Sequence, residues 1–120
     1  MGLVEENELV AIVRGLIDST KMGTLVWQIY DDEGSAEFTG STDRFVYYIK
    51  SRDEDDLAPY RFQIFKKSES SGAQLVLEHV TRPESIATEP IGVLFGTAKL
   101  SAFGIKSLKD EILGDLNLPF

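Results

Sequence analysis

The sequence contains no cysteine. Disulfide bonds, thiolate metal sites and cysteine nucleophiles are therefore excluded. No stretch approaches the roughly 18 consecutive apolar residues of a membrane span, so we expect none. The first residues are acidic and lack an apolar run followed by a small-residue cleavage site. We therefore expect no signal peptide and a cytoplasmic protein.

Basic residues are few and scattered. The chain has 12 Lys and Arg against 20 Asp and Glu, a net charge of −8, and its only adjacent basic pair is Lys66-Lys67. Nucleic acids and anionic membranes require clustered cations, so we expect neither as a partner. The negative charge lies in residues 1–60, which carry 13 acidic and 5 basic residues. This asymmetry permits a basic protein partner, or simply a soluble protein.

Motifs for catalysis or cofactors are also missing. The glycines at 92, 96 and 104 form no phosphate-binding loop, and there is no zinc motif, nucleophile elbow or carboxylate pair. The single histidine, His79, has no flanking partner motif, which favours a structural or edge role. Residues 53–56 lack the alternating ligands and central glycine of a calcium loop. We expect a non-enzymatic protein with no cofactor and no metal.

The 120 residues are 42% hydrophobic, enough for one domain over residues 1–120 with a single core. The apolar residues near the N-terminus follow the spacing of one helix face, with acidic residues in the first turns. These apolar residues are Leu9, Ile12, Val13, Leu16 and Ile17. We expect a helix here, followed by an exit loop over residues 19–23.

Four segments rich in β-branched and aromatic residues then predict strands. They are residues 25–30, 44–51, 60–66 and 73–80. A short piece around Phe38 leads into the second and could belong to the same strand or to a fifth. The short loops between them favour an antiparallel meander of four to five strands.

The C-terminal third is less regular. Residues 91–103 are apolar and interrupted by glycine, which fits either a short helix or a strand and turn. The largest apolar residues in this segment are Val93, Leu94, Phe95, Leu100 and Phe103. Ser107 with Asp110 and Glu111 resembles a capping arrangement for a final helix that ends near Leu116. The predicted fold is α+β: an N-terminal helix packed on an antiparallel meander sheet, with one or more C-terminal helices.

Alternation along the strands assigns two faces to the sheet. The first face is apolar, and we place it in the core beneath the N-terminal helix: Leu25, Trp27, Ile29, Phe45, Tyr47, Ile49, Tyr60, Phe62, Ile64, Leu75 and Leu77. The second face is mixed: Val26, Gln28, Tyr30, Val46, Tyr48, Arg61, Gln63, Phe65, Val76 and Glu78. Either residues 91–116 or another chain would cover it, and we favour residues 91–116.

The second face and two acidic turns are the candidate partner-binding features. Tyr30, Tyr48 and Phe65 would supply apolar contact. The acidic residues are Asp31, Asp32, Asp53, Glu54, Asp55 and Asp56. They could attract a basic partner, although an ordinary solvated loop is the simpler interpretation of residues 53–56. If both turns lie at one end of the sheet, their fields add.

The aromatic residues also allow two other interpretations, a stacking surface for nucleic-acid bases and a ligand pocket. Trp27, Tyr47, Tyr60 and Phe62 could stack nucleic-acid bases, but no basic residues accompany them, so we assign them to the core. Tyr47, Tyr60 and His79 could instead line a ligand pocket between helix and sheet.

The order of features from Trp27 to Leu77 is similar to that of small stand-alone bacterial α+β domains of uncharacterised function. An aromatic-rich strand ending near Ile49, an acidic linker and the segment Pro59-Tyr60-x-Phe62-x-Ile64 carry the resemblance. It implies the fold and a bacterial or phage origin, and it brings no catalytic residues. Together these features suggest an interaction module of the inhibitor, immunity or adaptor type that binds a protein partner or itself. The alternative is a ligand-binding protein or enzyme.

Overall fold

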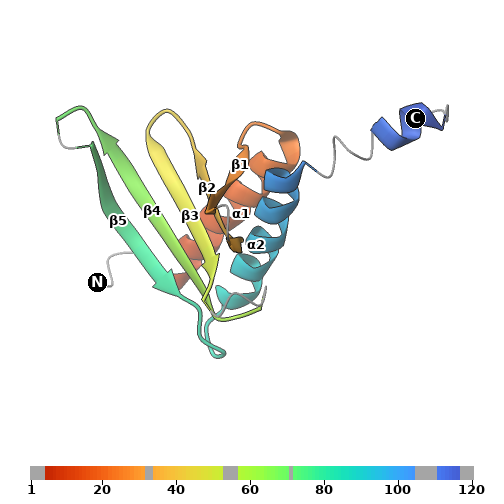
Figure 1. Cartoon of the computed structure of the whole chain (residues 1–120). Coiled ribbons are helices and arrows are strands. Elements are labelled where there is room, and N and C mark those ends of the chain that lie inside the picture. The colour runs from red at the N-terminus through yellow and green to blue at the C-terminus, as the bar shows by residue number, and fades with distance from the viewer. Residues whose placement is uncertain (1–4, 32–33, 53–56, 71, 105–110, 117–120) are drawn as a thin grey trace.

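Figure 1 shows the computed structural model, which describes residues 5–31, 34–52, 57–70, 72–104 and 111–116. One helix precedes five strands and a second helix follows them. The elements are α1 (Glu6–Met22), β1 (Trp27–Asp31), β2 (Gly34–Ser41), β3 (Phe45–Ser51), β4 (Tyr60–Ser68), β5 (Gly72–Val80) and α2 (Thr88–Phe103). Residues 111–115 are also helical.

The five strands form one antiparallel sheet in the order β1-β2-β3-β4-β5. The predicted α+β fold with an antiparallel meander is therefore confirmed. Phe38 does not belong to the second predicted strand but to a strand of its own, β2, where it lies between Ile29 and Ile49. Small and polar residues dominate β2, so its composition gave a weak strand signal.

Both helices pack on the same face of the sheet, side by side (Figure 1). Our expectation that residues 91–116 cover the second face was therefore wrong, because α2 lies on the first face beside α1. The width of the sheet explains why α2 also packs on the first face. Five strands spaced about 4.8 Å apart span about 19 Å, whereas one helix covers only about 10 Å. The apolar first face thus needs a second helix to exclude water from it.

The core lies between the two helices and the first face of the sheet. Its buried hydrophobic residues are Leu9, Val13, Leu16, Ile17, Leu25, Trp27, Phe38, Ile49, Tyr60, Phe62, Ile64, Leu77, Ala87, Ile91, Leu94, Phe95 and Ala98. The Phe95 ring lies 5.5 Å from that of Phe38 and 5.0 Å from that of Tyr60, between centroids. The core assignment of Trp27, Tyr60 and Phe62 is confirmed, and Tyr47 packs against the core while partly exposed.

Helix α1 runs further than the sequence suggested, through residues 19–22 of the expected exit loop. The Thr20 hydroxyl donates to the Leu16 carbonyl at 2.7 Å, which holds this turn in the helical frame. The helix ends at Gly23, whose φ of 83° is in the left-handed region that favours glycine. Of the expected stripe, Ile12 lies at the margin and is partly exposed.

The segment over residues 91–103 is helical, so the strand-and-turn alternative is wrong. Pro90 lies in the first turn of α2, where a missing N–H breaks no helical hydrogen bond. Leu94 and Phe95 are buried, as expected of the largest apolar residues. Val93, Leu100 and Phe103 are exposed, which the sequence did not suggest. Ser107 and Asp110 lie outside the described residues.

Candidate interaction surfaces

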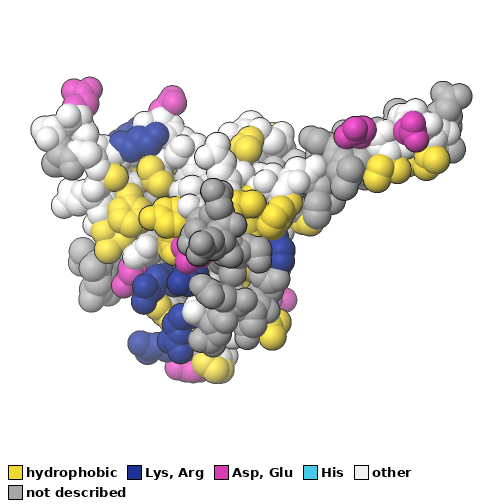
Figure 2. All heavy atoms as spheres, viewed as in Figure 1, with side chains coloured by type: hydrophobic (Ala, Val, Ile, Leu, Met, Phe, Trp, Pro, Cys, Tyr) yellow, Lys and Arg dark blue, Asp and Glu magenta, His cyan; other side chains and the backbone are white. Residues whose placement is uncertain are grey.

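The second face of the sheet, here called the open face, is covered by none of the described segments. The view of Figure 2 shows hydrophobic side chains grouped over the strands on the left. Val26 is 61% exposed and Tyr30 62% exposed, while Val46, Tyr48 and Phe65 are partly buried by their neighbours. The predicted residues Tyr30, Tyr48 and Phe65 therefore share one accessible surface.

Tyr30 and Tyr48 are in contact across β1, β2 and β3. Their rings meet edge to face with centroids 5.3 Å apart. The Tyr48 hydroxyl donates to the Glu37 carboxylate at 2.9 Å, and that carboxylate also pairs with Lys50 at 3.1 Å. Burial, and then the Glu37 carboxylate, raise the pKa of Tyr48 above its usual value. Tyr48 is thus a neutral, fixed donor that orients the aromatic pair.

Leu75 belongs to the open face rather than to the core, where we had placed it. Ile64 pairs with Leu77, yet the next residue of β4, Phe65, pairs with Leu75. Val76 is the extra residue of a β-bulge, which reverses the alternation of side chains along β5. Leu75 therefore lies opposite Phe65 and is 41% exposed.

Basic side chains gather at one end of the sheet (Figure 2). Lys50 lies directly opposite Arg61 in the β3–β4 register, and Figure 2 shows Lys and Arg side chains grouped below the hydrophobic ones. The meander brings the β1–β2 and β3–β4 connections to this same end, as their flanking residues show. The condition for the two acidic turns to act together is thus met by the topology.

Most acidic residues of the two turns lie outside the residues that the structure describes. Asp32, Asp53, Glu54, Asp55 and Asp56 lie outside the described residues, and Asp31 ends β1 with its side chain undescribed. Their role in attracting a basic partner therefore stays a prediction.

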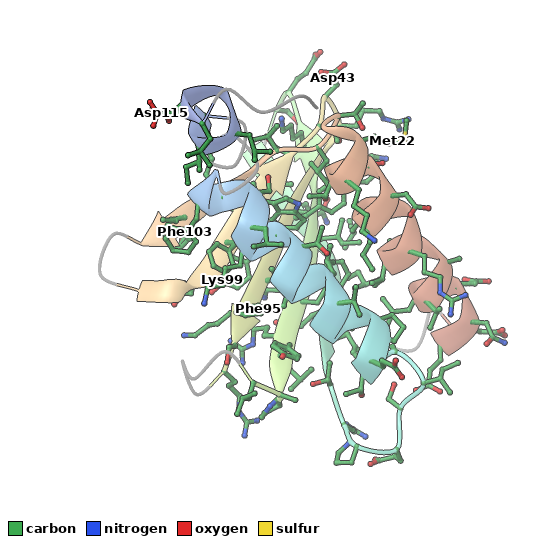
Figure 3. The ribbon with its side chains drawn as sticks, turned by 90° about the vertical axis from the view of Figure 1, so that its right-hand side faces the viewer. Met22, Asp43, Phe95, Lys99, Phe103 and Asp115 are labelled. Carbon is green, nitrogen blue, oxygen red and sulfur yellow. The ribbon has the colours of Figure 1, made fainter. Side chains whose placement is uncertain are left out.

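A second exposed apolar surface, here called the α2 stripe, consists of Val93, Gly96 and Leu100 on the solvent side of α2. In Figure 3 the helix lies in front of the sheet, with α1 to its right. Val93 is 48% exposed and Leu100 53% exposed, and Gly96 is also exposed. Sequence reasoning missed this surface. The signal was present in the spacing of three and then four residues, which repeats one side of a helix.

The three residues proposed for a ligand pocket do not converge. Tyr47 lines a groove of about 430 Å³ between α1 and the sheet, whereas Tyr60 is buried against Phe95. His79 lies opposite Phe62 in the β4–β5 register. Tyr47 pairs with Ile64, four residues along β4 from Tyr60, so the core side chains of β4 separate the three.

His79 is partly buried on the core side of β5. Its Nε2 atom is buried, and no described group forms a hydrogen bond with it. Burial lowers the pKa of His79 below its usual value, the nearby Glu6 opposes this shift, and Arg82 adds to it. The arrangement fits the predicted structural role, with the imidazole neutral at pH 7.

Within the described residues no group of three or more His, Asp or Glu side chains is placed to hold a metal ion. None of the described helices is both long enough and apolar enough to cross a membrane. No protein-family model, curated protein or solved structure matches this chain.

Proposed function

We propose that the protein is a non-enzymatic interaction module that binds a protein partner through the open face of its sheet. The observation that carries this proposal is the placement of both helices on one face. They leave Val26, Tyr30 and Leu75 exposed on the other. Contiguous apolar surface of this kind, bordered by polar residues, is typical of protein–protein contact sites.

The chemistry of the open face suits a partner that binds and dissociates. Tyrosine offers a large apolar ring and a polar tip, a combination enriched at such interfaces. Tyr48 is held by Glu37 and by the Tyr30 ring. A side chain that is already ordered loses little conformational entropy on binding. Acidic turns at one end would attract a basic partner and speed its association.

The proposal is tested by affinity capture from the native host with matched surface variants. Tyr30→Ser combined with Leu75→Ser removes apolar area from the open face and leaves the core intact. Met22→Ser is the control, because Met22 is highly exposed at the end of α1. We expect the captured partner to be lost with the double variant and retained with the control. A partner retained equally by both would contradict binding through the open face.

The acidic turns are tested with the captured partner. Charges on the protein surface are screened over about 10 Å at 0.1 M salt. Association steered by the acidic turns should therefore slow as the ionic strength rises, with little change in dissociation rate. An association rate that does not respond to salt would remove steering from the proposal.

Ligand binding between α1 and the sheet is the second candidate, supported by the groove that Tyr47 lines. Gly15 opens this groove, since a Cβ atom there would meet no atom within 4 Å. A ligand in the groove should raise the melting temperature, and Gly15→Leu should abolish that shift by filling the space. A shift that survives Gly15→Leu would place the ligand elsewhere.

A further inference from the structure

The glycines of α2 differ in conformation and in what surrounds them. Gly104 ends the helix with a φ of 67°, and a Cβ atom at Gly92 would lie 3.4 Å from the Tyr60 ring. Gly96 has a helical conformation, and a Cβ atom there would meet nothing within 4 Å. Glycine inside a helix costs about 1 kcal/mol relative to alanine. Nothing in the described part of the chain offsets this cost at Gly96.

Two exposed apolar side chains flank Gly96 on the solvent side of α2. They are Val93, three residues before it, and Leu100, four residues after it. An amphipathic surface helix normally turns polar residues to solvent, whereas α2 exposes these apolar side chains. Spacing of three and four residues is the spacing with which one helix packs along another. A glycine at the centre of such a stripe lets the two backbones approach closely.

We propose that the α2 stripe is a homodimer interface in which α2 packs antiparallel against α2 of a second copy. The stripe is self-complementary in this arrangement. With the twofold axis beside Gly96 and Thr97, Val93 of each copy lies against Leu100 of the other. The contact is isologous, so it closes at two copies.

The C-terminal helical segment supports a second copy as the occupant. Residues 111–116 lie beyond the C-terminal end of α2 (Figure 1), and their Ile112 and Leu116 are exposed. In the antiparallel arrangement this end lies beside the N-terminal end of the partner's α2. A groove of about 310 Å³ between α1 and α2 opens there, lined by Ile17, Ile86, Val93 and Arg14 among others. Its apolar walls complement the exposed Ile112 and Leu116, while Arg14 and Glu89 place one charge of each sign along it.

The oligomeric state is the first test, measured by sedimentation equilibrium on the full chain. We expect a dimer at micromolar concentrations. Val93→Lys with Leu100→Lys should give a monomer, because the dimer would bury four like charges. Val26→Lys with Leu75→Lys on the open face is the matched control and should remain dimeric. A wild-type chain that is monomeric throughout this range, or a dimer that the α2 variant leaves unchanged, would overturn the proposal.

The variant Gly96→Ala tests whether the glycine allows the two helices to approach closely or has no role in the contact. The added methyl should weaken the dimer about tenfold or more through overpacking while stabilising the isolated helix. Higher thermal stability with an unchanged dimer affinity would refute close approach at Gly96.

Cross-linking tests the helix direction, and the cysteine-free chain allows single cysteines to be placed without background. A disulfide requires Cα atoms within about 7 Å. Thr97→Cys lies at the axis and should form a covalent dimer on mild oxidation. Glu89→Cys should not, since its two copies would be offset by about 22 Å along an antiparallel pair. Cross-linking through Glu89→Cys would indicate a parallel pair and contradict the arrangement. The dimer proposal and the proposed partner site on the open face involve different residues. Each can therefore be contradicted by its own variants without affecting the other.

Discussion

At the scale of single residues, the environment decides what each glycine contributes. Gly40 is buried on β2 and pairs with Trp27 on β1. A Cβ atom there would lie 3.1 Å from Cδ2 of Trp27 and 3.3 Å from Cδ1 of Leu25. Gly15, on α1, faces open space. The same substitution should therefore have opposite effects at the two positions.

Gly40→Ala should lower the free energy of unfolding by about 1–3 kcal/mol, because the Trp27 indole has to move in a packed core. Gly15→Ala should raise it by about 0.5–1 kcal/mol through higher helix propensity. Urea unfolding followed by Trp27 fluorescence measures both. A gain in stability with both variants would show that the Gly40 site can relax.

His79 should make stability depend on pH. Its folded-state pKa is lowered by burial, so the unfolded chain binds more protons as the pH falls below about 6.5. The stabilisation is therefore complete at pH 7.5 and declines towards pH 5.5. His79→Leu should flatten this dependence, and urea unfolding at the two pH values measures it. His79 is the only histidine, so an equally steep dependence in the variant would assign it to carboxylates instead.

At the scale of elements, a buried hydrogen-bonded link joins α1 to the sheet. The Trp27 indole N–H donates to the Thr20 hydroxyl at 2.9 Å, and that hydroxyl donates to the Leu16 carbonyl. This buried link fixes the last turn of α1 over the start of β1. The Trp27 backbone N–H donates to the Ser101 hydroxyl of α2 at 3.0 Å. Trp27 thus connects both helices to one strand.

Thr20→Val should lower the free energy of unfolding by about 1–3 kcal/mol, because it leaves the buried indole N–H without a partner. Thr24→Val is the matched control. The Thr24 hydroxyl also donates to a backbone carbonyl, that of Ser19, yet it is exposed. We expect the control to change stability by less than about 0.5 kcal/mol. Equal losses in thermal unfolding would mean that the hydroxyl-to-carbonyl bond matters rather than the link to Trp27.

At the scale of the whole molecule, the sheet separates a core from an interaction surface. Leu75 and Leu77 lie two residues apart on β5, yet the bulge at Val76 places them on opposite faces. Leu77→Ala should cost about 2–5 kcal/mol, as expected for a buried leucine. Leu75→Ala should change stability little. Denaturant unfolding of the two variants checks the faces, and equal costs would mean that another segment covers Leu75.

Much of this architecture could be predicted from the sequence, but the register and the packing partners could not. The stripe from Leu9 to Ile17 and the alternation around Ile49 and Phe62 correctly predicted a helix over an apolar sheet face. The strand that contains Phe38 was not separated from the next one because it is made mostly of small and polar residues, whose strand preference is weak. Leu75 was misplaced because a bulge leaves no mark in the alternation of apolar residues. Among the candidate site residues, Tyr30, Tyr48 and Phe65 were placed on the correct face.

The sequence by itself determined the fold class, the apolar first face and the exclusion of thiol chemistry, since these depend on composition and local periodicity. Only the tertiary structure decided that α2 lies beside α1 and leaves the open face uncovered. It also decided that the α2 stripe faces solvent around Gly96. The physical reason is that periodicity identifies the apolar faces of helices and strands. The width of the sheet and the packing of the helices then decide which of these faces are buried in the folded structure.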